Sequence, residues 1–273
     1  MDTETVMKVQ AVTPQKRSRA YWVLSDALVL IKRSMMHIIK NMDQLLSVAF
    51  MPIMFLLLFR YVFGGAIDTG GTTYVNFLIA GILVQTAAFG STYTAIGVTT
   101  DLQRGIIDRF RSLPMFSSAV LVGHTVSDLV RNTISAIIMV LVGLLVGFRP
   151  TASVWEWIMV FGILMLFTFA FSWLSAIMGL FAKTIEGVQW LTFVLVFPLT
   201  FASSAFVPTE GMPTALRVFA ENQPVTQVID AIRALLVGTP IENAGWLAVI
   251  WSVGILLVTI PVAAYIFRRR TSK

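Results

Sequence analysis

Three polar side chains inside an apolar run are the residues best placed to do chemistry in this sequence. Asp128, Arg131 and Asn132 fall within residues 118–148, at spacings of three and four that place them on one face of a helix. A carboxylate and a guanidinium inside a membrane are usually paired or directed toward a cavity. The sequence therefore predicts either a structural ion pair or part of a gate. A third interpretation is that both side chains extend to the nearby membrane surface.

The segment from Asp101 to Pro114 is a charged stretch between two long apolar runs. As a helix, it would place Leu102, Ile106 and Phe110 on one face and charged side chains on the rest, and proline would end it. Two interpretations stay open: a solvated loop whose arginines only set the topology, or a docking helix for a cytoplasmic partner. The residues assigned to docking are Asp101, Arg104, Gly105, Asp108, Arg109, Phe110, Arg111 and Pro114.

Polar residues also recur in two apolar runs, where a helix that faces only lipid would not need them. Small and polar residues of this kind commonly pack one membrane helix against another. The alternative is a polar lining for a substrate path, for which the candidates are Gln85, Tyr93, Gln189, Thr200 and Ser203. The 20 Phe and 13 Met residues would supply an adaptable apolar surface for such a path.

Other chemistries lack the residues that they need. The chain has no cysteine, which excludes disulfides, thiolate metal sites and a cysteine nucleophile. His37 and His124 are isolated in sequence from any acidic cluster with the spacing of metal ligands, so we expect no metal site. No glycine-rich phosphate-binding loop occurs, so we expect this chain to bind no cofactor and to hydrolyse no nucleotide itself. The net charge of +6 is better explained by membrane topology than by nucleic-acid binding.

The elements that must position these residues are membrane helices. The sequence is 57% hydrophobic and only 12% charged, with a mean hydropathy of +0.82, whereas soluble domains average about 25% charged residues. A run of roughly 20 apolar residues can cross a bilayer as a helix. We therefore expect an all-α integral membrane protein with six spans, at residues 45–63, 74–99, 118–148, 155–182, 188–207 and 246–267.

Four further segments flank or interrupt the six-span domain, which we place at residues 44–267. Residues 1–20 are expected to be a flexible cytoplasmic terminus, and residues 21–43 an amphipathic helix lying in the membrane interface. Residues 208–238 are too apolar for a solvated loop and too rich in Pro and Gly for a span. This pattern predicts two short helices that lie in or dip into the outer leaflet. Residues 268–273 form a basic cytoplasmic tail.

The basic residues predict the orientation of the chain in the membrane. If both termini are cytoplasmic, 16 of the 20 Lys and Arg residues fall on the cytoplasmic side. Those that fall elsewhere are Arg60, Arg149, Arg217 and Arg233. The opposite orientation would reverse a four-to-one bias, so we expect both termini in the cytoplasm.

Several short motifs follow one another in a recognisable order. They are Asp101-Leu-Gln-Arg-Gly105, Arg109-Phe-Arg-Ser-Leu-Pro114, Phe206-Val-Pro208, Met212-Pro213 and Asn222-Gln-Pro224, followed by Ala231, Arg233 and Gly238. With these motifs the chain resembles an ABC-2-type transporter permease, and within that family the daunorubicin/doxorubicin resistance type of drug-export permease. The resemblance covers nearly the whole chain. One departure is Gln223, which is inserted before Pro224 where many relatives have a plain Asn-Pro.

The resemblance implies partners for this chain. Permeases of this family dimerise, and each copy docks a separate cytoplasmic ATPase subunit through the helix that corresponds here to Asp101–Pro114. ATP and Mg would then be bound by the partner ATPase, in a bacterial inner membrane whose lipids surround the spans. The outer segment, here residues 208–238, would roof the path. The outer-gate candidates are Phe206, Pro208, Met212, Pro213, Pro224 and Arg233.

Together these inferences predict the membrane subunit of an exporter for an amphipathic drug, a natural product or a lipid-like compound. The alternative within transport is a permease for a lipid-linked glycan, whose path should carry more aromatic side chains. A membrane enzyme is disfavoured because no catalytic constellation is present in the sequence. An ion channel is disfavoured because no ring of pore-facing charge is recognisable.

Overall fold

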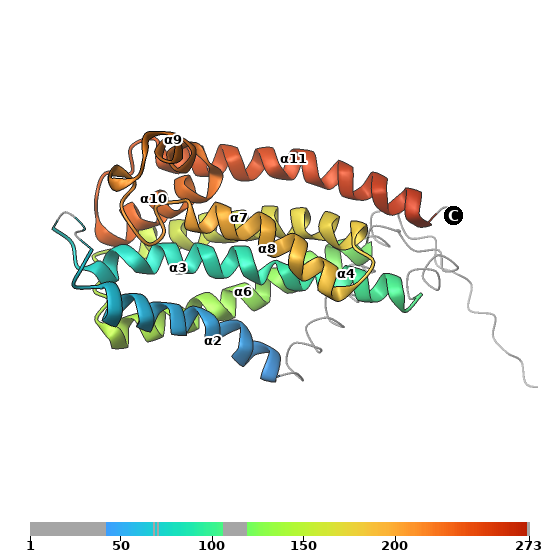
Figure 1. The fold of residues 1–273 in the computed structure, drawn as a ribbon, viewed down its shortest axis with the longest axis horizontal. Coiled ribbons are helices and arrows are strands. Elements are labelled where there is room, and N and C mark those ends of the chain that lie inside the picture. The colour runs from blue at the N-terminus through green and yellow to red at the C-terminus, as the bar shows by residue number, and fades with distance from the viewer. Residues whose placement is uncertain (1–41, 68, 70, 106–118, 272–273) are drawn as a thin grey trace, which may run out of the picture.

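The computed structural model describes residues 42–67, 69, 71–105 and 119–271, and every regular element in these ranges is a helix (Figure 1). The predicted flexible terminus and nearly all of the predicted interfacial helix lie outside the described residues. In chain order the helices are α2 (Met42–Leu58) with a π-helical turn (Phe59–Phe63), α3 (Tyr74–Gly90), α4 (Thr92–Gln103), α6 (Ala119–Val146), α7 (Val154–Phe181), α8 (Ile185–Phe201), a 3₁₀ turn (Thr209–Gly211), α9 (Thr214–Asn222), α10 (Pro224–Val237) and α11 (Ala244–Thr271).

Four helical stretches of the described chain are long and apolar enough to cross a membrane. They are Tyr74–Gln103, which joins α3 and α4, together with Val120–Val146, Val154–Phe181 and Ala244–Arg270. The stretches Ala49–Phe63 and Ile185–Phe201 are apolar but shorter. Helix therefore occupies each of the six ranges predicted as spans, and four of these ranges reach spanning length.

The fifth predicted span differs most from the structure. We expected it at residues 188–207, but α8 has 17 residues and ends at Phe201. At 1.5 Å per residue it is about 26 Å long, slightly less than the roughly 30 Å hydrocarbon core of a bilayer. Beyond Phe201 the backbone leaves the helical region at Ala202 (φ −88°, ψ 55°), and the chain turns. Composition alone does not show this end, because Ala202, Ala205, Phe206 and Val207 prolong the apolar stretch around two serines.

Local signals set several helix ends. α7 begins at a capping box, in which the Ser153 side chain accepts from the Glu156 amide and the Glu156 carboxylate accepts from the Ser153 amide. α10 has Pro224 in its first turn, where a missing N–H costs little. It ends at Gly238, whose left-handed backbone (φ 77°) favours glycine.

α3 is the central helix of the bundle, and nearly all of its side chains are buried. It packs against α2, α6, α7, α8 and α10, and its apolar residues make up much of the main hydrophobic core. Close backbone approach helps this packing: a Cβ atom added to Gly81 would lie 2.2 Å from the carbonyl oxygen of Ala205. Figure 1 shows α9 and α10 gathered at one end of the bundle, opposite the C-terminal end of α11.

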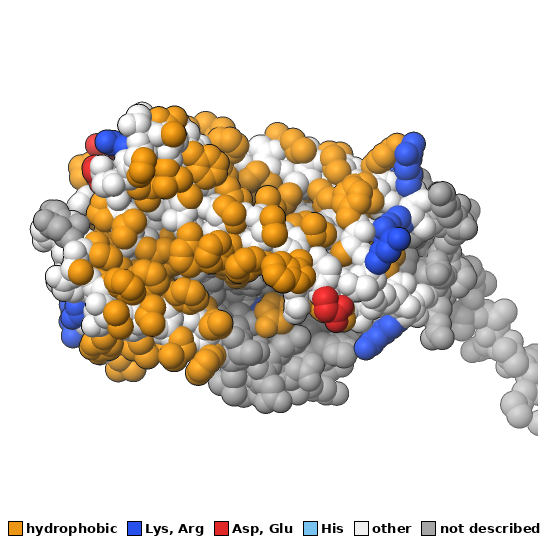
Figure 2. All heavy atoms as spheres, in the orientation of Figure 1, with side chains coloured by type: hydrophobic (Ala, Val, Ile, Leu, Met, Phe, Trp, Pro, Cys, Tyr) orange, Lys and Arg blue, Asp and Glu red, His pale blue; other side chains and the backbone are white. Residues whose placement is uncertain are grey.

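Basic residues lie at both ends of the bundle. At the end that carries the C-terminus, the Gln103 amide donates to the Lys183 carbonyl (2.7 Å) and Arg270 donates to the Phe181 carbonyl (3.3 Å). At the α9–α10 end, Arg149 contacts Asn76 through two hydrogen bonds of 2.9 and 3.2 Å. Figure 2 shows the apolar face between these ends, with Lys and Arg side chains near both of its limits.

Candidate functional site

A cavity of about 450 Å³ opens between α2, α3, α4 and α8. Its wall is mostly aromatic and aliphatic, and the face of the molecule that carries α2 and α8 is covered by apolar side chains (Figure 2). The lining residues are Met51, Pro52 and Phe55 from α2, Gln85, Thr86, Phe89 and Gly90 from α3, Thr92, Tyr93 and Ile96 from α4, and Gln189, Phe193, Phe197 and Phe201 from α8. A cavity of this size and character suits a drug-sized apolar ligand.

A few polar groups interrupt the apolar wall. Gln85 is buried on α3, Tyr93 is half-buried on α4 and Gln189 is exposed on α8. The Thr86 hydroxyl donates to the carbonyl of Ile82 within its own helix (2.6 Å), so its polarity is already satisfied. Within the described part of the chain, no hydrogen bond joins the side-chain amides of Gln85 and Gln189 to a partner.

Three of the five predicted path residues therefore lie together at this cavity, namely Gln85, Tyr93 and Gln189. Thr200 and Ser203 are absent from the cavity lining and lie at and just beyond the C-terminal end of α8. There the Thr200 hydroxyl donates to the Val196 carbonyl (2.9 Å), and the Ser203 hydroxyl donates to the Thr200 carbonyl (2.5 Å). These two hydroxyls close a helix end in this structure, and they offer little to a ligand.

The charged residues of α6 form a buried network that includes a side chain of α7. Arg131 donates to one carboxylate oxygen of Asp128 at 2.7 Å, and Ser172 of α7 donates to the other. Asp128 is fully buried and Arg131 is only 7% exposed, so the pair lies inside the described bundle. The Asn132 amide donates to the backbone carbonyl of Asp128 (3.1 Å).

Tyr93 connects this network to the cavity. The Arg131 guanidinium carbon lies 4.6 Å from the centroid of the Tyr93 ring, an arrangement that allows a cation–π contact. Tyr93 also lines the cavity, so one ring touches both features. Next to it, a Cβ atom on Gly90 would lie 2.1 Å from the Asn132 Oδ1 atom, so only glycine allows α3 to pack this closely on α6.

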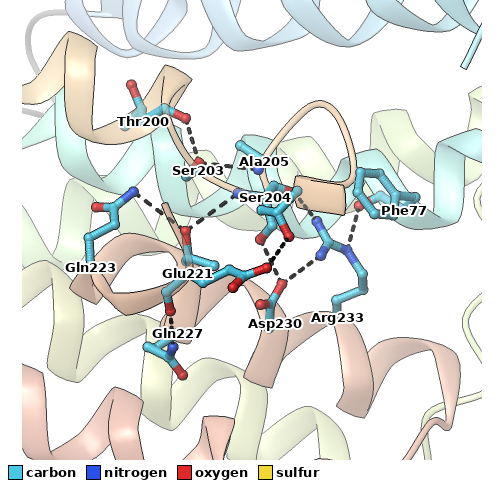
Figure 3. A network of polar contacts seen from close by, with 12 residues as sticks. Phe77, Thr200, Ser203, Ser204, Ala205, Glu221, Gln223, Gln227, Asp230 and Arg233 are labelled. Atoms are coloured by element: carbon cyan, nitrogen blue, oxygen red, sulfur yellow. Dashed lines mark hydrogen bonds and ion pairs between the residues drawn. The ribbon is translucent and has the colours of Figure 1, made fainter. Parts of the chain in front are cut away.

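Just beyond the C-terminal end of α8, a second polar network holds the irregular residues 202–208 (Figure 3). The Gln223 amide donates to the carbonyls of Leu199 (2.6 Å) and Ala202 (3.0 Å), which the end of the helix leaves without partners. The Ser203 hydroxyl accepts from the Ala205 amide (3.1 Å). Gln223 therefore caps α8 from the N-cap position of α10.

Arg233 binds the same segment from the middle of α10. It donates to the Phe77 carbonyl (3.1 Å), to Asp230 (2.7 Å) and to the Ser204 carbonyl, and its guanidinium carbon lies 3.7 Å from the Phe77 ring centroid. Ser204 in turn donates to Asp230 (2.6 Å). The hydroxyl of Tyr74 donates to the Phe206 carbonyl (2.9 Å). Side chains of α3 and α10 thus satisfy backbone groups that no regular helix can satisfy.

The remaining outer-gate candidates lie at the turns of the outer segment. Pro208 precedes the 3₁₀ turn, Met212 follows it, Pro213 precedes α9 and Pro224 begins α10. On exposed α9, Arg217 donates to the Glu221 carboxylate at 2.7 Å, and this hydrogen bond lowers the pKa of Glu221.

The described part of the charged segment differs from the predicted helix. Asp101 belongs to the last turn of α4, which ends at Gln103, and Arg104 caps that helix. Gly105 then adopts a left-handed backbone (φ 61°), so the helical residues Asp101–Gln103 belong to the end of α4 and not to a separate helix that begins at Asp101. The docking candidates Asp108, Arg109, Phe110, Arg111 and Pro114 lie outside the described residues.

Comparison with known proteins identifies the family. A family model described as ABC-2 type transporter matches residues 26–237. The chain belongs to this family. It is 31% identical over 249 residues to a daunorubicin resistance ABC transporter permease protein of Streptomyces coeruleorubidus, covering 91% of this chain and 88% of that protein. It is 22% identical over 267 residues to a probable doxorubicin resistance ABC transporter permease protein of Mycobacterium tuberculosis, covering 95% and 94%. Nodulation protein J of Rhizobium meliloti is 25% identical over 187 residues, covering 66% and 68%.

This ABC-2 permease is the membrane subunit of an ABC transporter and a multi-pass membrane protein with relatives in drug resistance. Sequence reasoning missed two of its polar contacts. Gln223 stood out only as an insertion, yet it caps α8. His124 looked isolated, but its Nε2 lies 2.8 Å from the Asp101 carboxylate. Neither contact has a sequence signal, because the partners are 24 or 23 residues apart and on different helices.

Proposed function

We propose that this ABC-2 permease exports an amphipathic drug, natural product or lipid-like compound from the cytoplasm or the inner leaflet. The cavity between α2, α3, α4 and α8 is the observation that carries the proposal. Two predicted path helices contribute to its wall, and three of the predicted path residues lie in it. Exposed apolar side chains of α2 and α8 also line the cavity, and they would give a membrane-dissolved compound a route in.

The lining favours a cargo with a large apolar body and few polar groups. Six of its side chains are aromatic, and burying one aromatic ligand ring against them would release roughly 1.5–3 kcal/mol of hydrophobic free energy. The amides of Gln85 and Gln189 and the hydroxyl of Tyr93 can each bond one polar substituent. A strongly charged cargo would lose its hydration here without gaining a matched partner, so it should bind poorly.

The energy for export comes, in this proposal, from ATP hydrolysed with Mg on a separate ABC ATPase. The family supports an ATPase partner, and the sequence has no phosphate-binding loop of its own. The segment Asp101–Pro114 is the proposed docking site for that ATPase. We place both termini in the cytoplasm of a bacterial cell, with two permease copies and two ATPases in the complex. The basic residues gathered at the Lys183 and Arg270 end support this orientation.

A lipid-linked glycan is the second candidate cargo, because the lining is rich in aromatic side chains on which sugar rings can stack. Its weakness is polarity: a sugar presents many hydroxyls, and the wall offers few free partners. Competition separates the two cargoes. An excess of lipid-linked glycan should leave drug export unchanged if the drug is the natural type of cargo.

The test is ATP-dependent accumulation of daunorubicin in inside-out vesicles that contain the permease and the ABC ATPase from the same gene neighbourhood. We expect accumulation that requires both subunits and ATP. The variant Gln85→Leu keeps a similar volume and should weaken export of a polar-substituted drug, whereas Thr86→Val should not, because the Thr86 hydroxyl is already bonded to its own helix. Equal export with and without the permease would overturn the proposal.

A further inference from the structure

α4 is attached to α7 by two hydrogen bonds near its cytoplasmic end. The Thr99 hydroxyl donates to the Gly179 carbonyl (2.8 Å), and the Gln103 amide donates to the Lys183 carbonyl just beyond α7 (2.7 Å). The two backbones also meet closely, because a Cβ atom on Gly179 would lie 2.4 Å from the Ala95 carbonyl oxygen. One side of α4 is therefore attached to α7 by side-chain hydrogen bonds and a close backbone contact.

The other side of α4 is attached to α6 at two points. Near the cytoplasmic end, His124 Nε2 lies 2.8 Å from an Asp101 carboxylate oxygen. Further into the bundle, Arg131 of α6 stacks over the Tyr93 ring of α4. The imidazole sits in a space that a glycine provides, since a Cβ atom on Gly97 would lie 2.7 Å from His124 Nδ1. An imidazole N–H can donate to a carboxylate in either protonation state of the ring.

These two contacts match in spacing along the antiparallel helices. Tyr93 and Asp101 are separated by about 12 Å along α4, and His124 and Arg131 by about 10 Å along α6, at 1.5 Å per residue. Two helices joined at both ends of such a stretch must move together. Immediately before this stretch the long span is interrupted: α3 ends at Gly90 and α4 begins at Thr92. Gly90 and Thr92 both line the cavity.

We propose that the Asp101–His124 pair positions α4 for transport. By joining α4 to α6 at their cytoplasmic ends, the pair makes these helices one unit. A displacement imposed beside Asp101 is then carried along α4 to Tyr93 and changes the cavity wall, with the interruption after Gly90 absorbing the movement. His124 is a positioning residue in this scheme, since it touches no cargo. The inference rests on the proposed function, because it assumes that an ATPase acts near Asp101.

The test compares three single substitutions in the complete complex with its ATPase. His124→Leu removes the donor, His124→Gln returns an N–H at a similar reach, and Thr125→Val is a control on the same helix whose hydroxyl bonds its own Val122 carbonyl. For each we would measure ATPase co-purification, basal ATP hydrolysis and daunorubicin transported per ATP. We expect His124→Leu to lower transport per ATP about tenfold while bound ATPase and basal hydrolysis stay unchanged. His124→Gln should recover most of the transport, and Thr125→Val should match the wild type.

Three results would overturn the inference. One is unchanged transport in His124→Leu. Another is equal loss in His124→Leu and His124→Gln, because the donor would then be irrelevant. The third is loss of the ATPase from His124→Leu, which would make the residue part of docking. Failure of the wild-type chain to bind any ATPase is a different result: it would overturn the proposed function, and this inference with it.

A cross-link gives an independent measurement that does not depend on how His124→Leu folds. The chain has no cysteine, so Asp101→Cys with His124→Cys provides a unique thiol pair. Before cross-linking we expect low transport per ATP. A short bifunctional methanethiosulfonate should restore it, because a covalent link also joins α4 to α6. Loss of the remaining transport on cross-linking would show that the helices must separate, and would contradict the inference.

Discussion

The buried pair of Asp128 and Arg131 allows a sharp test, because the chain contains a second pair of the same length. Arg131 and Asp128 are 2.7 Å apart with side chains 9% and 0% exposed. Arg217 and Glu221 are also 2.7 Å apart, but their side chains are 45% and 40% exposed. The two pairs therefore differ mainly in burial. Burial determines how much free energy of unfolding is lost when one partner is removed and the other is left unpaired.

Removing one member of the buried pair should be strongly destabilising. In Arg131→Met the Asp128 carboxylate would keep Ser172 as a donor but lose its countercharge. Leaving a buried charge uncompensated typically costs about 3–5 kcal/mol. Replacing both members, as in Asp128→Leu with Arg131→Met, removes the charge altogether and is often close to neutral. The double variant should therefore be more stable than the single variant.

The measurement is unfolding of the purified permease in mixed micelles as SDS is added, monitored by the fluorescence of its 7 Trp residues. Arg217→Met is the matched control. It removes an exposed pair that solvent already screens, so its transition should stay near that of the wild type. Equal shifts for Arg131→Met and Arg217→Met would refute the reasoning, as would a double variant no more stable than Arg131→Met.

The same variants separate the two roles left open for the pair. If Asp128 and Arg131 serve only to hold helices together, the stable double variant should export daunorubicin nearly as well as the wild type. If they form part of a gate, the double variant should fold and bind its ATPase but fail to export. The Tyr93 ring, which contacts Arg131 and also lines the cavity, gives the gate a route to the cargo.

Two other substitutions test the packing around the site. Gly90→Ala should lower stability by about 1–3 kcal/mol, because its Cβ atom would lie 2.1 Å from Asn132 Oδ1; Gly162→Ala, with no atom within 4 Å, should not, and equal SDS transitions would contradict this. Gln223→Leu should increase hydrogen exchange at the C-terminal end of α8, because it leaves two carbonyls unpaired at a cost of about 1–3 kcal/mol. Exchange no faster than in Gln227→Leu, which lacks these contacts, would show that Gln223 is dispensable there.

Much of the fold follows from hydrophobicity and length, which the sequence displays directly. The range of α7 was predicted within one residue at each end, because a long apolar run fills it, and the structure adds the capping box of Ser153 and Glu156 at its start. The end of α8 was missed because apolar residues continue past it. Only the contacts of Gln223 and Arg233, from another helix, show why the chain can leave the helix at that depth.

The kinds of residue that form the site could be predicted from the sequence, but only some of their positions could. Gln85, Tyr93 and Gln189 stood out because amides and a phenol are unusual within apolar runs, and they lie at one cavity. Thr200 and Ser203 stood out equally, but their hydroxyls bond backbone carbonyls close in sequence. Composition cannot distinguish these two uses, because a hydroxyl that caps a helix and a hydroxyl that faces cargo are the same residue type in the sequence.

The most direct test of the central claim asks whether cargo occupies the cavity. Because the chain has no cysteine, a single Gln189→Cys thiol reports access to the cavity, and Trp155→Cys at the exposed start of α7 serves as the control. The measurement is the rate at which a maleimide labels each thiol as daunorubicin is added. We predict saturable slowing at Gln189→Cys and none at Trp155→Cys, at drug concentrations that saturate export. Unchanged labelling of Gln189→Cys while export saturates would contradict the account.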